Sequence, residues 1–175
     1  IVGTQALYRA TTGAGYNVAI GSYAMGGNFT TANVDSCVAI GYEALNGTLT
    51  TDATGTVAVG QRAAKAITSG AGNTAIGFKA LTAENDGDHN TAVGYEALAT
   101  QNASDGDGQN TAVGFRAGKA VTAASGSTFL GNLAGGTVTT GNDNIAIGND
   151  AMNGAATTGD DNIAIGVSAG DALTS

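Results

Sequence analysis

Two acidic loop segments carry the side chains best suited to hold a metal ion. Both read Asp-Gly-Asp, and they lie in adjacent stretches of the sequence between copies of a repeated phrase. Carboxylate oxygens suit calcium, so Asp86, Asp88, Asp105 and Asp107 are candidate ligands. Asp-Gly sequences also form tight turns, and we favour that explanation. No cofactor is therefore predicted, and calcium is the one alternative.

The sequence offers no arrangement of residues that suits an active site. The single histidine, His89, follows one of these acidic loops, and the repeat pattern places no nucleophile beside it. Hydrolysis of a glycan would need a pair of fixed carboxylates, whereas the acidic residues here cluster with glycine in turns. We predict no catalytic residues and no enzymatic activity.

These side chains are positioned by a short phrase that occurs ten times in 175 residues. It consists of an apolar pair around alanine, then glycine, then alanine three places later, and it recurs every 17–20 residues. A fixed phrase at such intervals is typical of a solenoid, in which each copy forms one coil. The motif glycines are Gly3, Gly21, Gly41, Gly60, Gly77, Gly94, Gly114, Gly131, Gly148 and Gly166.

The residues before the glycine, which is numbered position 0, predict a short strand. Position −1 is branched in every copy and position −3 is always β-branched, and such side chains fit a pleated surface. Side chains alternate across a strand. We expect the branched pair to point into the coil, and the alanine at −2, present in eight of ten copies, to face a neighbouring chain.

The glycine at 0 and the alanine at +3 occur in all ten copies. Glycine in a strand indicates a positive φ or a backbone approach too close for a Cβ atom, so it is expected to turn the corner of the coil. A second short strand or bend is expected at +3. Asparagine recurs at −4, where its amide can bond loop backbone groups and the next coil. We predict an internal ladder of Asn17, Asn73, Asn90, Asn110, Asn144 and Asn162.

Aromatic and charged side chains follow the glycine in the middle coils. A column of aromatic rings is either a sugar-binding strip or a structural ladder at a chain interface, and we favour the ladder. Stacked opposite charges assist register more than stability, and this column is expected to face water. The aromatic residues at +1 include Phe78, Tyr95 and Phe115, and the charged residues at +2 are Glu43, Arg62, Lys79, Glu96 and Arg116.

The composition excludes several classes of partner. Net charge is −8, so the chain repels nucleic acid and anionic membranes. No apolar run is long enough to cross a bilayer, and no membrane insertion is predicted in this segment. The one cysteine, Cys37, stands where other copies carry asparagine, serine or threonine. It is expected to be a small turn residue, with a bridge between chains as the alternative.

One chain alone is not expected to be stable. The few large apolar side chains of each coil offset little of the entropy lost on ordering it, and the small residues at −2 and +3 suggest close contact between identical chains. Two further copies are therefore expected, in a homotrimer. Both ends cut through a copy of the phrase, so residues 1–175 are expected to be a single repeat array from a longer fibre.

The forms Asn17–Gly21, Asn144–Gly148 and Asn162–Gly166 resemble the head repeat of trimeric autotransporter adhesins. The variant at Asn73–Leu81 and Asn90–Leu98 is similar to repeats in phage tail fibres. The resemblance spans essentially the whole chain. It implies an all-β fold, a parallel β-solenoid in the form of a left-handed β-roll of about ten coils, assembled as a homotrimeric fibre.

The function expected from this resemblance is structural. The chain would be a shaft or head segment of an extracellular trimeric fibre that attaches to a host cell or surface, in a phage tail fibre or, alternatively, in a bacterial cell-surface adhesin. A cell-surface glycan or protein would be its receptor. The alternative of another class is an ice-binding solenoid, suggested by threonines at 48–51 and 137–140. These lie in loops of unequal length, so strict register is not expected.

Overall fold

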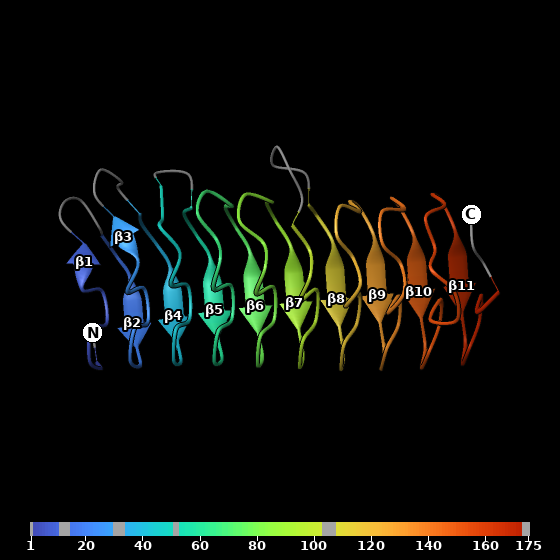
Figure 1. Ribbon diagram of the computed structural model, residues 1–175, viewed down its shortest axis with the longest axis horizontal. Helices are drawn as coiled ribbons and strands as arrows, with labels where there is room; N and C mark the ends of the chain where they lie inside the picture. Colours follow the sequence, from blue (N-terminus) through green and yellow to red (C-terminus); the bar gives the residue numbers. More distant parts are fainter. Residues whose placement is uncertain (1, 11–14, 30–33, 51–52, 103–107, 173–175) are drawn as a thin grey trace.

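Nine three-residue strands form one parallel sheet that runs the length of the molecule (Figure 1). The computed structural model describes residues 2–10, 15–29, 34–50, 53–102 and 108–172, and this part contains strands and turns but no helix. Each strand pairs with those of the preceding and following coils, so the chain is a parallel β-solenoid. The strands are β2 (Val18–Ile20), β4 (Val38–Ile40), β5 (Val57–Val59), β6 (Thr74–Ile76), β7 (Thr91–Val93), β8 (Thr111–Val113), β9 (Thr128–Leu130), β10 (Ile145–Ile147) and β11 (Ile163–Ile165).

The strands pair so that equal positions of the phrase lie side by side. Ala92 of β7 is opposite Ala75 of β6 and Ala112 of β8. The nine strands bound about eight turns, fewer than the ten coils expected from ten phrases. The first phrase adds only an isolated bridge between Val2 and Ile20. A short second sheet pairs β1 (Arg9–Ala10) with β3 (Asn28–Phe29).

The rest of each coil is also joined to its neighbours by backbone hydrogen bonds. On the wall that follows the glycine, Arg116 N–H donates to the Tyr95 carbonyl at 2.8 Å and Leu98 N–H donates to the Ala117 carbonyl at 3.0 Å. On the loop side, Thr122 N–H donates to the Thr139 carbonyl at 2.8 Å. Since backbone groups pair along several sides of the coil, successive coils stack in a fixed register.

The prediction that the branched side chains point inward and the alanines outward is wrong. Ala39, Ala92 and Ala146 at −2 are fully buried, whereas Ile76 at −1 is 39% exposed and Ile163 at −3 is 68% exposed. The alanines at +3 are buried in the same core cluster as those at −2. The two walls of the coil thus lie too close together near the glycine for branched side chains, which point outward instead.

Larger side chains fill the coil where it widens beyond position +3. Leu45, Leu98 and Met152 at +4 are fully buried. One strand departs from this pattern, because Phe129 takes the place of alanine at −2 and is also fully buried. Its ring fits because +4 is glycine in its own coil and in the coil before it.

Each motif glycine turns the corner between the two walls. Gly21 has φ +123°, and a Cβ atom added to it would lie 2.6 Å from the carbonyl oxygen of Gly41. The other motif glycines have φ between 129° and 140° and, apart from the last, face the glycine of the next coil. Any other residue would meet both the unfavourable φ and this contact. The corner therefore requires glycine in successive coils.

Candidate functional site

The most extensive feature of the surface is the outer side of the long sheet, here called the strand face. It is formed by the side chains at −3 and −1, two from each of the nine strands. None of them is charged, and large apolar members such as Ile20 and Leu130 are 40% and 47% exposed. A contiguous apolar surface of this kind marks a site of interaction.

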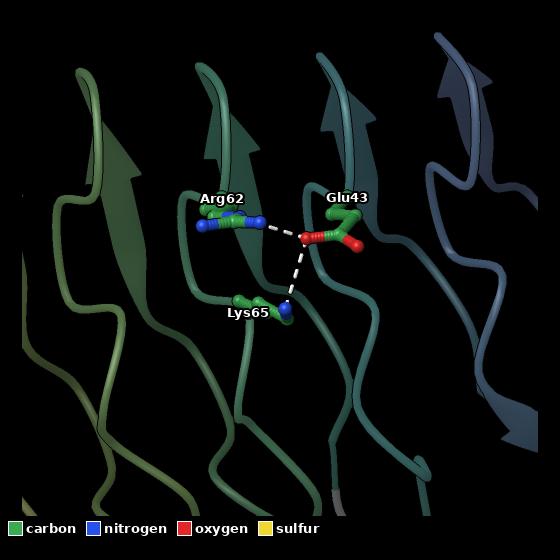
Figure 2. Close-up of polar contacts among 3 residues, drawn as sticks. All are labelled: Glu43, Arg62 and Lys65. Atoms are coloured by element: carbon green, nitrogen blue, oxygen red, sulfur yellow. Dashed lines mark hydrogen bonds and ion pairs between the residues drawn. The ribbon is translucent and has the colours of Figure 1, made fainter.

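Two ion-pair clusters lie on the wall that follows the glycine. Figure 2 shows the first, in which Glu43 Oε2 lies 2.8 Å from both Arg62 Nε and Lys65 Nζ of the next coil. In the second, Glu96 Oε2 lies 3.0 Å from Arg116 Nε and Lys119 Nζ. The hydrogen bond from Lys65, followed by that from Arg62, lowers the pKa of Glu43 against the opposing effect of desolvation. Lys119 and Arg116 lower the pKa of Glu96 in the same way.

The lysines of these clusters were missed in the sequence analysis, which considered only position +2. Lys65 and Lys119 each follow the arginine by three residues, a spacing visible in the sequence. Lys79 at +2 lies over the ring of Phe78, 5.2 Å from its centroid. The charged column therefore consists of two clusters that each join adjacent coils, with Lys79 between them.

The aromatic residues at +1 form a stack along the solenoid. Phe78 and Tyr95 have ring centroids 5.1 Å apart, and Tyr95 and Phe115 have centroids 5.4 Å apart, with 14° between the planes in both pairs. The Arg116 guanidinium lies 5.0 Å from the centroid of Phe115. A sugar-binding platform needs open ring faces, and here the rings cover one another. The geometry suits a structural ladder.

The asparagines at −4 lie on the inner side of the coil, and most are fully buried. Asn110 Nδ2 donates to the Ala124 carbonyl at 2.6 Å, and its Oδ1 accepts the N–H of Ser127 in the next coil at 2.8 Å. Asn73 and Asn144 make the equivalent pairs of bonds. The amides thus join each coil to the next, and both of their bonds are internal.

Cys37 occupies one place in this row and is fully buried. Its Sγ donates to the Ala53 carbonyl at 3.3 Å, and burial raises the pKa of the thiol. A disulfide to another chain would require an exposed sulfur, so the geometry favours the small structural residue over the bridge.

The acidic loops are used as turns where the structure describes them. Asp88 Oδ1 accepts the N–H of Ala71 in the preceding coil at 2.7 Å. Asp35 Oδ1 accepts the N–H of Gly15 in the same way at 2.6 Å. Asp105 and Asp107 lie outside the described residues, as part of 103–107. Within the described part of the chain, no group of three His, Cys, Asp or Glu side chains could hold a metal ion.

The loop threonines stack more regularly than their unequal loops suggested. Thr122, Thr139 and Thr157 follow one another in three successive coils through backbone hydrogen bonds. The Thr122 hydroxyl donates to the Thr139 carbonyl at 3.2 Å, and the Thr137 hydroxyl donates to the Ala155 carbonyl at 2.7 Å. These hydroxyls are bonded within the protein, whereas an ice-binding surface would have to present them to solvent.

Comparison with known proteins gives no relative. No family model, curated protein or solved structure matches this chain. Among the residues that the structure describes, no helix has the length and apolar character needed to span a membrane.

Proposed function

We propose that this chain is a structural shaft or head segment of an extracellular homotrimeric fibre, most simply a phage tail fibre that attaches the virion to its host cell. Its coils form a left-handed β-roll, and two further copies of the chain complete the assembly. The segment carries no catalytic site. A bacterial cell-surface adhesin is the second candidate, because phrases such as Asn144–Gly148 resemble the adhesin head repeat.

The strand face is the observation that carries this proposal. Copies with a net charge of −8 repel one another, and this uncharged face is where they can approach. A stable interface takes roughly 20–30 residues from each partner. The face supplies two side chains from each of nine strands, and the neighbouring aromatic stack extends it. Contact between copies would remove this apolar surface from water.

The regular cross-section supports a structural role over catalysis. Backbone bonds, asparagine amides and ion pairs all run from one coil to the next, so the chain is held together along its length. In a solenoid each repeat contacts only its neighbours, and the array can extend by adding coils. This arrangement suits a fibre, in which length and stiffness are the functional properties.

Measurement of mass by sedimentation equilibrium on the full chain tests the assembly. We expect about three times the 16.9 kDa chain mass. The double variant Ile40→Asp and Ile147→Asp puts charges on the strand face and should sediment as a folded monomer, as judged by circular dichroism. The control Thr140→Asp and Thr158→Asp adds the same charges on exposed loops and should remain trimeric. A monomeric wild-type chain would contradict the proposal.

The location of the protein separates the two candidates. An antibody raised against this chain should label the tail fibres of virions in electron micrographs. Labelling of the bacterial surface instead would favour the adhesin, and labelling of neither would contradict an attachment role.

A further inference from the structure

Four adjacent strands of the strand face carry threonine at −3. They are Thr74, Thr91, Thr111 and Thr128 of β6 to β9, and they pair directly in the sheet. On either side of this threonine tract, position −3 is valine or isoleucine, from Val57 of β5 to Ile145 of β10. The strand face is therefore aliphatic at both ends and carries hydroxyl groups in the middle.

The hydroxyls of the threonine tract have no hydrogen-bond partner among the residues that the structure describes. This differs from the loops, where the hydroxyls of Thr122 and Thr137 donate to carbonyls of the next coil. Water can bond the hydroxyls of the tract in a single chain. In the proposed trimer this face would be covered, and a covered hydroxyl without a partner is destabilising.

We propose that the threonine tract sets the axial register in which copies of this chain pack against one another. The inference rests on the proposed trimer. In register, the threonines of all copies lie at the same level, and each hydroxyl can donate to one neighbour and accept from another. A slip by one coil moves a threonine at each end of the tract opposite an aliphatic side chain, and its hydroxyl loses its partner.

Such a device is needed because the strand face is nearly periodic. Successive strands lie about 4.8 Å apart, and a slip by that distance would keep all but one layer of apolar contact. A face with equal side chains in every coil specifies its register only weakly. A few polar positions in an apolar seam fix the register in coiled coils at some cost in stability, and the tract has the same arrangement here.

The test replaces all four tract threonines by valine in the full chain. Valine has nearly the shape of threonine and is the natural residue at −3 in Val18, Val38 and Val57, so the coil should fold. The control replaces four exposed loop threonines by valine, at Thr48, Thr50, Thr140 and Thr158. All chains also carry Cys37→Ser, and Ala156→Cys in an exposed loop for a spin label. Pulsed electron paramagnetic resonance then measures the distances between labels in the trimer.

In the unchanged tract and in the loop control, we expect one distance, because the three labels lie at the same height. The tract variant should still form trimers but show additional, longer distances, from offsets of about 4.8 Å for each coil of slip. A single unchanged distance in the tract variant, or several distances in the unchanged chain, would overturn the inference. A chain that is monomeric with its tract intact would instead reject the proposed function beneath it.

Discussion

The two sides of the same strands differ in a way that is unusual for a single protein domain. The inner side carries alanine, fully buried in Ala92 and Ala112, while the outer side carries valine and isoleucine that remain about half exposed. Large apolar side chains are ordinarily the buried ones. The difference teaches that spacing between the two walls of the coil limits the inner side chains. The outer side chains are free of that limit and are suited to contact something outside the coil.

One strand shows the size limit directly. Phe129 occupies the inner position of β9. A Cβ atom added to Gly118 would lie 2.7 Å from its ring, and one added to Gly135 would run into it. Most other coils place a leucine or methionine at this +4 position, such as Leu98 and Met152. The phenylalanine ring therefore takes the space that a +4 side chain fills elsewhere.

Phe129→Ala is expected to have the largest effect on the comparison, because it empties the inner side of one coil. Loss of a buried phenylalanine costs about 3–5 kcal/mol of unfolding free energy. Adding Gly135→Leu should restore much of this loss, since the pair of changes reproduces the ordinary coil. Leucine tolerates the backbone there, because Leu98 has a similar positive φ. Urea denaturation of the single and double variants measures both effects.

Gly135→Leu alone provides the control for this cycle. It should destabilise the protein, because the added side chain meets the Phe129 ring. Purely additive effects of the two changes would show that the ring and the +4 position do not share one space.

Equal enlargements on the two sides of β7 are expected to have unequal effects. Ala92→Leu overfills the inner side and should cost about 1–3 kcal/mol. Val93→Leu on the outer side should stay within about 0.5 kcal/mol, and leucine is already present at this position in Leu130. Urea denaturation of both variants tests the difference. A larger loss for the outer change would contradict the size limit.

The sequence predicted the solenoid, since the spacing of the phrase requires one coil per copy, but it gave the wrong orientation of the strands. Alternation shows which side chains share a face and not which face is inside. Alanine at both −2 and +3 was a usable signal, because two walls lined with small side chains can approach closely. The fit between Phe129 and Gly135 depends on space between coils, and Lys65 reaches Glu43 through the fold of the +5 segment. Neither contact follows from the phrase alone.

The ion-pair clusters sharpen the comparison through pH. The pKa of Glu43 is lowered in the folded state, so its ion pairs stabilise the protein above the unfolded pKa of about 4.3. This stability is lost as pH falls through the lower, folded pKa. Each pair contributes about 0.2–1 kcal/mol, so Glu43→Gln should reduce the unfolding free energy at pH 7 and have less effect near pH 3. Glu96→Gln should behave alike, whereas the cost of Ala92→Leu, which removes no charge, should not vary with pH. Urea denaturation at both pH values, repeated in high salt to screen the pairs, separates a charge effect from a packing effect; an equal loss for Glu43→Gln at pH 3 and pH 7 would assign the effect to packing.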